Sequence, residues 1–466
     1  MDRNKIFNLL LGLLFSTFLV KILNFFKEIQ ISYFYGTGEI IDKYNIIMIA
    51  PSIALSTIAP AFGLILVSRY TNGQKLNIQK KEIIFFVASV VLLCVISLIT
   101  NFQSGNSFDW LVSLGISILF LFQVILVYYL HCFNEFNKGS FSSMIQIMTN
   151  LIVVGFSIVF KSYYILLIGL FLGIILQLLY LVGVIKVKNY TPNIEIKTLK
   201  EESFFHSFFS VVLGYGLIEI LVSAQKFFAT YYNEEGLVSA INYSYKVMNL
   251  PISILLFAVL SVLFPVMTRT NEGKLQEITK GLLSGISFVM LPIAILFYFF
   301  AEFIISILFE RGSFNIDSVI VTGRQLKGFA LLLLPLSLYS SLLRVVFVKK
   351  EWSYIYKSGV IILTSIILFN LISLYIQDVT LFTFTIPIAF YLGITISFWK
   401  VIASSLDKDF YKSLLGSIVM ILTIIVLSYT NSNHWISIAL SLIIYIGSQL
   451  VLKNTLFKNL IGRVRS

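Results

Sequence analysis

Charge is scarce in this chain. Only 12% of its 466 residues are Asp, Glu, Lys or Arg, whereas 58% are hydrophobic. Soluble globular domains carry about twice that share of charged residues, so the composition excludes a soluble domain. Apolar stretches about as long as a bilayer is thick recur from residue 6 to residue 453. They leave no room for a soluble catalytic domain, and we expect the function to reside in the membrane.

Residues that bind metals or form disulfides are also few, with two cysteines and three histidines. Cys94 and Cys132 fall in apolar stretches, where a thiol is usually a small hydrophobic group. The spacing of these residues predicts no disulfide framework and no metal site. A membrane enzyme acting on prenyl-phosphate lipids would need clustered acids, histidines or metal ligands on loops. The sequence offers none, so we expect neither enzyme activity nor a cofactor.

The formal net charge of +12 has two explanations. A basic excess is typical of nucleic-acid-binding proteins, and it also arises when Lys and Arg in cytoplasmic loops orient a membrane protein. The position of the basic residues favours the second, once the membrane-spanning helices are placed. Cutting the sequence at polar clusters predicts fourteen of them. They cover residues 6–33, 43–68, 83–100, 110–133, 140–160, 163–185, 204–232, 237–268, 281–308, 319–348, 354–376, 379–400, 412–429 and 434–452.

The basic residues alternate between the two sides of these spans. With the N-terminus inside, 24 of the 34 Lys and Arg residues fall in inner segments, and five fall in or beside outer loops. This bias places both termini in the cytoplasm. The first apolar stretch lacks a small-residue cleavage site, so we expect a retained helix and not a removed signal peptide.

An offset of two hundred residues reveals an internal repeat. The aligned pairs are Gly36 and Gly236, Asp42 and Asn242, Pro51 and Pro251, Leu55 and Leu255, and Arg69 and Arg269. Six predicted helices separate the copies, so both enter the membrane in the same direction, as in transporters built from parallel repeats. We therefore predict an all-α polytopic membrane protein with six-helix bundles at residues 1–200 and 201–405, and helices 13 and 14 with a cytoplasmic tail at 406–466. A substrate cavity is expected between the bundles.

Five basic residues remain inside the predicted spans: Lys21, Lys27, Lys226, Lys246 and Arg344. A charge near the bilayer centre costs about 2.5 to 3.5 kcal/mol, so lipid-facing placement is unfavourable. Each Lys forms a buried ion pair or extends to the headgroups, or several together line a cationic cavity for phosphate. Lys21, Asn24 and Glu28 share one helical face, with Lys27 beside Glu28.

Three residues are candidates for ion coupling or gating: Asp42, Glu219 and Lys226. Asp42 lies at the outer start of the second span, where it would bind a coupling cation. A helix N-terminus favours an acid in any case, so a purely structural role is also open. Glu219, Ser223 and Lys226 form a stripe on the seventh predicted helix.

Four segments carry longer motifs. They are KEIQISYFYGTGEIIDKYNIIMIAP at 27–51, LGIILQLLYLVGVIK at 172–186, VSAINYSYKVMNLP at 238–251 and LFERGSF at 308–314. These segments resemble the MurJ (MviN) lipid II flippases of the multidrug, oligosaccharidyl-lipid and polysaccharide exporter superfamily, and the similarity covers essentially the whole chain. By position, Lys27 and Lys246 stand where that family has cavity arginines. The sequence departs from the family at Leu55 and Ser56, which replace an Arg pair, and at Asn249, which replaces an acid.

The resemblance implies a flippase that carries an undecaprenyl-diphosphate-linked sugar to the outer leaflet by rocking two bundles around a cationic cavity. It also implies that helices 13 and 14 form a groove for the lipid tail. Lys27 and Lys246, helped by Lys21, would then attract the diphosphate, with Asn24 and Glu28 beside them. We expect a monomeric transport unit in a bacterial inner membrane, with a polyprenyl-linked glycan and membrane lipid but no nucleic acid as partners. The membrane potential, Na⁺ or H⁺ would couple to transport.

Two other transport functions remain open. A flippase for O-antigen, capsule or exopolysaccharide units is one, because the Arg pair that the family has is missing at Leu55 and Ser56. A multidrug-type exporter is the other, although it usually needs a coupling carboxylate deep in a bundle. The acids Glu28, Glu219 and Glu302 instead lie close to basic residues or helix ends.

Overall fold

The computed structural model describes residues 3–70, 76–78, 80–102, 108–133, 135–190, 194–196, 204–430 and 433–455. The chain divides into two compact units, of which the first holds residues 1–242 with 309–318 and the second holds residues 243–308 with 319–466. The two units are defined by the contacts within each of them. They do not show which helices move together as a bundle. The division into bundles at residues 200 and 405 therefore stays a prediction.

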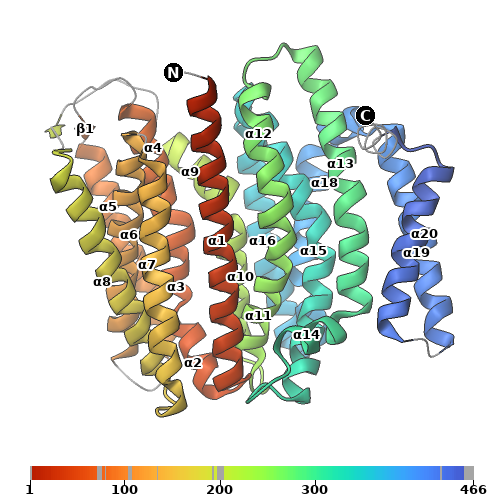
Figure 1. Ribbon diagram of the computed structural model, residues 1–466, viewed down its shortest axis with the longest axis horizontal. Helices are drawn as coiled ribbons and strands as arrows, with labels where there is room; N and C mark the ends of the chain where they lie inside the picture. Colours follow the sequence, from red (N-terminus) through yellow and green to blue (C-terminus); the bar gives the residue numbers. More distant parts are fainter. Residues whose placement is uncertain are drawn as a thin grey trace. The chain divides into compact units, whose positions relative to one another are not determined.

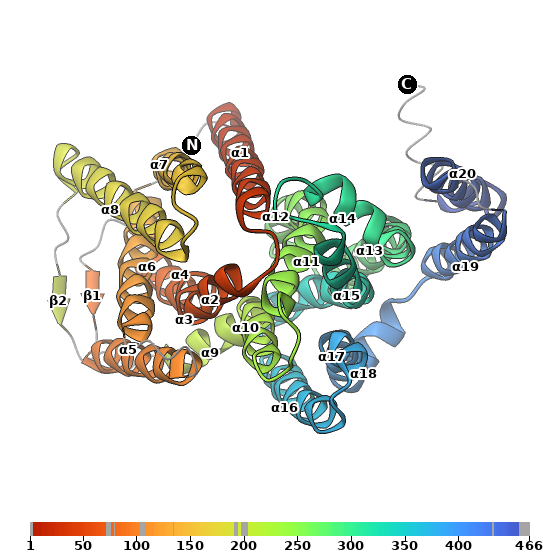
Figure 2. The same cartoon turned by 90° about the horizontal axis from the view of Figure 1, so that it is seen from below.

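The first unit is a helical bundle with a small strand pair (Figure 1). Its elements are α1 (Arg3–Tyr35), α2 (Glu39–Ile47), α3 (Ile49–Ile53), η1 (Ala54–Ile58), α4 (Ala59–Tyr70), β1 (Leu76–Ile78), α5 (Lys80–Asn101), α6 (Asp109–Cys132), α7 (Phe136–Gly155), η3 (Phe156–Ile158), α8 (Tyr163–Val187), β2 (Ile194–Ile196), α9 (Phe204–Tyr215), α10 (Leu217–Ala229) and the start of α11 (Leu237–Pro251). Helix α6 is central, because α3, α4, α5, α7 and α8 all pack against it. Strands β1 and β2 pair in parallel (Figure 2).

The second unit contains the remaining helices. Its elements are the rest of α11, η4 (Ile252–Leu256), α12 (Phe257–Met267), α13 (Glu272–Phe299), α14 (Ala301–Phe309), α15 (Ile316–Lys349), α16 (Ser353–Ile376), α17 (Val379–Thr383), α18 (Thr385–Ser405), α19 (Lys408–Tyr429) and α20 (His434–Val451). The hairpin of α19 and α20 packs on α13 through Met420, Ile424 and Tyr445, and the Tyr445 hydroxyl donates to the Phe288 carbonyl at 2.8 Å. The lipid-tail groove expected at this hairpin stays a prediction.

An all-α polytopic protein is confirmed, whereas the count of fourteen spans is not. In the described part of the chain, eleven helices are long and apolar enough to cross a membrane, or twelve if one bent pair counts as a span. That pair falls in the predicted span 204–232, where residues 208–214 and 217–229 meet at 61°. The predicted span 281–308 is two helices, and α13 begins earlier because the Asn271 side chain caps it by accepting from the Lys274 N–H at 3.1 Å.

The two copies of the repeat have the same local geometry. Gly36 and Gly236 both adopt a positive φ, of 59° and 81°. Each repeat proline is followed by a π-helical turn, Ala54–Ile58 after Pro51 and Ile252–Leu256 after Pro251. A proline inside a helix lacks the N–H that would bond four residues back, and a wider turn relieves the mismatch. The repeat read from the sequence is thus visible in the backbone.

Candidate functional site

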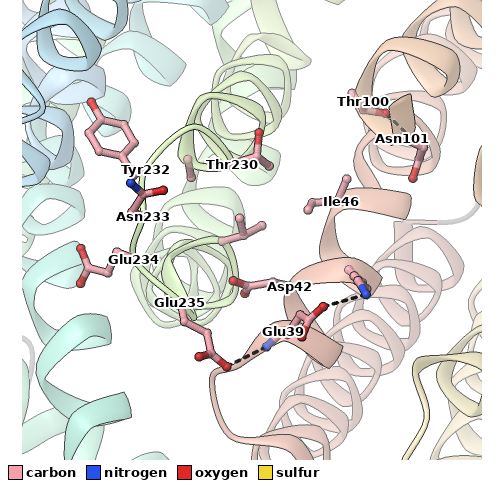
Figure 3. Close-up of a pocket in the computed structure, with 13 residues that line it drawn as sticks. Glu39, Asp42, Ile46, Thr100, Asn101, Thr230, Tyr232, Asn233, Glu234 and Glu235 are labelled. Atoms are coloured by element: carbon pink, nitrogen blue, oxygen red, sulfur yellow. Dashed lines mark hydrogen bonds and ion pairs between the residues drawn. The ribbon is translucent and has the colours of Figure 1, made fainter. Parts of the chain in front are cut away.

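A pocket of about 440 Å³ lies in the first unit, between the start of α2 and the turn that precedes α11 (Figure 3). Four acidic side chains line it, Glu39, Asp42, Glu234 and Glu235, against one lysine, Lys43. This balance disfavours an anion such as a diphosphate. Among the described residues, no group of three or more His, Cys, Asp and Glu is placed to hold a metal ion.

Asp42 uses its carboxylate to cap α11. Its Oδ2 accepts the Gly236 N–H at 3.0 Å, and its Oδ1 accepts the Ser239 N–H at 2.7 Å. The first N–H groups of a helix have no partner within the helix. The residue that precedes α11 is Gly236, which has no side chain to supply one, so a residue of α2 caps the helix across 194 positions of sequence. Charge-assisted bonds of this kind are about twice as strong as neutral ones.

The Asp42 carboxyl lies before the predicted span 43–68 and outside the apolar segment Ile49–Val67. Burial raises its pKa to about 6, and the nearby Glu235 charge acts in the same direction. The hydrogen bonds from Ser239 and Gly236 oppose this rise in pKa without cancelling it. The two helices are therefore joined through a group that titrates in a mildly acidic range.

The backbones on either side of this cap approach closely. A Cβ on Gly236 would lie 2.8 Å from Thr37 Cβ, and a Cβ on Gly36 would clash with the Ser313 carbonyl oxygen. Only glycine combines such contacts with a positive φ at no steric cost. The Glu39 N–H also donates to Glu235 Oε1 at 3.3 Å. Glycine at both repeat positions thus allows the turn after α1 to pack directly against two other turns.

The segment LFERGSF completes the arrangement. The Ser313 N–H donates to the Tyr33 carbonyl at 2.8 Å, and the Thr37 hydroxyl donates to Ser318 Oγ at 2.8 Å. We name the set of contacts among residues 33–42, 236–239 and 313–318 the latch. The sequence pointed to Asp42 and to the repeat glycines, but it gave no sign that Ser239 would bond to Asp42 or that Ser318 would bond to Thr37. The LFERGSF motif was the one signal in the sequence for the third part of the latch, residues 313–318.

Lys226, one of the candidates for ion coupling or gating, bonds to a residue of α11. Its side chain is buried, and its Nζ donates to Asn242 Oδ1 at 2.8 Å. Glu219 lies two turns earlier on α10 and is partly buried. Asn242 is the repeat counterpart of Asp42, so both copies of this position bond to a neighbouring helix. A coupling or gating role for Glu219 and Lys226 stays a prediction.

The predicted binding residues of α1 do not share one environment. Lys21 is exposed and Asn24 is partly buried, whereas Glu28 is only 6% exposed. Lys27 Nζ lies 3.3 Å from Glu28 Oε1, so these two side chains form an ion pair. Lys27 is therefore a cation that already has a carboxylate partner.

Lys246 belongs to the second unit and lies on α11, partly buried. Ser244, two residues earlier, donates to the Thr322 carbonyl at 2.7 Å and ties α11 to α15. The convergence of Lys246 with Lys27 and Lys21 in one cavity stays a prediction, because the residues belong to different units.

The sequence of the chain is similar to those of known proteins. The sequence profile of the family described as "Lipid II flippase MurJ" matches residues 113–447. A probable lipid II flippase MurJ of Buchnera aphidicola subsp. Baizongia pistaciae is 20% identical over 91% of this chain and 89% of its own. Its counterpart in Bdellovibrio bacteriovorus is 30% identical over 176 residues, and that match spans 36% of this chain and about a third of the relative (33%).

Solved structures share the fold. A structure described as "Lipid II flippase MurJ, inward closed conformation" has a TM-score of 0.73 at 20% identity, covering 96% of this chain and 99% of that one. An inward-facing multidrug resistance MATE family transporter has a TM-score of 0.56 at 13% identity, covering 83% and 94%. At these identities the likeness concerns the fold alone. The family profile covers most of the sequence, and the chain belongs to the lipid II flippase MurJ family.

Proposed function

We propose that this chain moves lipid II, an undecaprenyl-diphosphate-linked sugar precursor, from the inner to the outer leaflet of a bacterial inner membrane. The family match over residues 113–447 carries the proposal. The excess of Lys and Arg in alternate loops supports cytoplasmic termini. With that orientation, the latch lies at the outer end of the first unit.

The membrane potential supplies part of the driving force. Outward movement of an anion gains about 2.3 kcal/mol per charge per 100 mV, so a diphosphate with two uncompensated charges gains roughly 4.6 kcal/mol. This coupling requires no nucleotide. An inward gradient of Na⁺ or H⁺ is the alternative source of energy.

Lys27 is the residue of the first unit that we assign to the diphosphate. Its ion pair with Glu28 holds the ammonium in place at 3.3 Å before substrate arrives. A diphosphate that enters the cavity exchanges with Glu28 as the partner of Lys27, and Lys246 contributes the second positive charge. Because Glu28 is almost fully buried, it stabilises the lysine while the cavity is empty.

The latch closes the outer end while substrate loads from the inside. Two bonds from helix N–H groups to one carboxylate must break for α2 and α11 to separate at this end. Hydrogen bonds to a charged group contribute about 1.5 to 3 kcal/mol each. That range is comparable with the driving force available from the membrane potential, so the latch can hold the closed state and still open during transport.

Rescue of a bacterial strain depleted of its lipid II flippase tests the proposal most simply. The wild-type chain should restore growth. In proteoliposomes, Lys27→Ala and Lys246→Ala should abolish flipping of lipid II, whereas Lys43→Ala, which removes a lysine paired with Glu39 near the surface, should not. Normal flipping by both cavity variants would remove the proposed binding site.

A flippase for surface-polysaccharide units is the second candidate. Leu55 and Ser56 favour it, because they replace the Arg pair of the family and leave fewer cations for the head group. Failure to rescue the depleted strain, together with restored export of O-antigen or capsule in a suitable mutant, would select this candidate over lipid II.

A further inference from the structure

The end of α1 that leads into the latch is held by two different turns. The Tyr35 hydroxyl donates to the Ser162 carbonyl at 3.0 Å and lies 2.9 Å from Ser157 Oγ, in the turn between α7 and α8. Two residues earlier, the Tyr33 carbonyl accepts the Ser313 N–H at 2.8 Å, in the segment between α14 and α15. The last carbonyl groups of a helix have no partner within it, so the second contact also completes the end of α1.

The two contacts differ in their exposure to solvent. Ser157 is fully buried and Tyr35 is partly buried, whereas Ser313 is exposed, as are Arg311 and Gly312 beside it. A hydrogen bond that water can replace costs little to break. A buried polar group that loses its partner instead loses the full free energy of its hydration. The bond to Ser313 can therefore open more easily than those of Tyr35.

The two turns also differ in the helices that they join. The turn that holds Tyr35 joins α7 to α8, and α1 packs along α7, where a Cβ on Gly155 would lie 3.5 Å from Gln30 Nε2 (Figure 2). These three helices all belong to the first unit. Residues 309–318 also belong to the first unit, whereas the helices that they join, α14 and α15, lie mostly in the second. A movement of α14 and α15 would therefore pull on the contact at Ser313 and leave the contacts of Tyr35 in place.

The chain between Tyr35 and α2 is a short turn with a glycine on either side of Thr37. Gly36 has a φ of 59°, and Gly38 is the residue that precedes α2. Thr37 itself donates to Ser318 Oγ at 2.8 Å. Glycine can change its φ and ψ more freely than any other residue. The contact of Thr37 can therefore break and form again while α1 stays fixed as far as Tyr35.

We propose that Tyr35 is a positioning residue that holds the end of α1 on the α7–α8 turn throughout transport, so that the latch opens on one side only. The bonds to residues 236–239 and 313–318 break, and those of Tyr35 persist. The inference rests on the opening of the latch under the proposed function. By keeping the turn in place, Tyr35 returns Thr37 and Asp42 to the positions in which the latch closes again.

Loss of the Tyr35 hydroxyl tests the positioning. In a full-length chain whose two native cysteines are replaced by Ala, the rate of disulfide formation between Thr37→Cys and Ser318→Cys reports how well the turn is held. Tyr35→Phe keeps the ring and removes both hydrogen bonds, so the disulfide should form roughly fivefold more slowly. Tyr375→Phe is the matched control, because Tyr375 is 92% exposed, and it should leave the rate unchanged. Equal rates in the two variants would overturn the positioning role.

A covalent anchor tests whether the Tyr35 contacts persist. Tyr35→Cys and Ser162→Cys, both at partly buried positions, are joined by a bismaleimide about as long as the tyrosine side chain that it replaces. Before cross-linking, this variant should flip lipid II more slowly than the wild type, and cross-linking should restore the rate. A cross-link between Thr37→Cys and Ser318→Cys should instead stop flipping, although it begins only two residues further along the chain.

The outcomes separate this inference from the proposed function. Loss of flipping when positions 35 and 162 are joined would overturn the fixed anchor and leave the flippase function intact. Flipping that persists with either pair joined would overturn the opening of the latch, and the inference with it. A wild-type chain that flips no lipid II would overturn the proposed function as well.

Discussion

The two copies of the repeat keep the same backbone and differ in charge. Both have a glycine with positive φ before the helix, and both have a π-helical turn after the repeat proline. At the position between them, the first copy has Asp42 and the second has Asn242. Asp42 accepts from two backbone N–H groups, whereas Asn242 accepts from the ammonium of Lys226.

This difference shows which features a duplicated scaffold retains. The glycine and the proline set the path of the chain, so a change at either position would alter the fold of that copy. The side chain between them is free to take a different partner in each copy. In the first copy that partner is the buried N-terminal end of another helix, at Gly236 and Ser239.

The largest effect should follow loss of the first-copy carboxylate. Asp42→Ala leaves the N–H groups of Gly236 and Ser239 without their acceptor, at about 1 to 3 kcal/mol each. We expect the free energy of unfolding to fall by roughly 4 kcal/mol, with a matching loss of flipping. Thermal unfolding in detergent and lipid II flipping per folded molecule would measure both.

A control for this variant is Glu39→Gln, three residues earlier on the same helix. Glu39 pairs with Lys43 at 2.8 Å in an exposed position, so its loss should change neither stability nor flipping. Equal damage from Glu39→Gln and Asp42→Ala would mean that the start of α2 is merely sensitive to substitution.

Asp42 in the first copy should make the free energy of unfolding depend on pH. Asn242 in the second copy should not, because it does not titrate. Since burial raises the pKa of Asp42 to about 6, the folded state binds more protons than the unfolded state between about pH 4 and pH 6. The free energy of unfolding should therefore fall as pH rises through that window, by at most about 3 kcal/mol. Asp42→Asn should lack this component. Identical pH profiles for wild type and Asp42→Asn would show that the carboxyl does not titrate in this range.

Substitution of Gly236, the glycine of the second copy, should have a somewhat smaller effect on stability. Gly236→Ala forces a side chain into a positive φ and towards Thr37, which should cost about 2 kcal/mol of stability. Gly273→Ala is the matched control, because its Cβ meets nothing within 4 Å. That change should leave the melting temperature unchanged or raise it slightly. If both variants melt at the same temperature, the latch turns are not closely packed.

The smallest effect should come from giving the second copy the charge of the first. Asn242→Asp places a carboxylate against Lys226, which is 2.8 Å from the present side-chain oxygen. The attraction within a buried ion pair is largely offset by the loss of hydration. Stability should change by about 1 kcal/mol or less, and flipping should persist. A loss of flipping as large as that of Asp42→Ala would show that the two copies have equivalent roles.

Sequence reasoning reached the class of fold because hydrophobic runs and loop charges report directly on a membrane environment. It also found the repeat, since glycine and proline act through the local backbone. It did not identify the partners of Asp42. Gly236 and Ser239 lie nearly two hundred residues away, and glycine and serine are common at the start of any helix. A buried ion pair was one of the alternatives that the sequence left open for Lys27, but it did not single out Glu28 as the partner, since adjacent residues on a helix point about 100° apart.

Locking the latch would test the central claim, that the contacts of the turn between α1 and α2 must open during transport. Thr37 and Ser318 have hydroxyl oxygens 2.8 Å apart, so cysteines at these two positions should form a disulfide. In a chain whose Cys94 and Cys132 are replaced by Ala, oxidation of the pair should stop lipid II flipping, and reduction should restore it. Unchanged flipping by the fully cross-linked chain would contradict the claim.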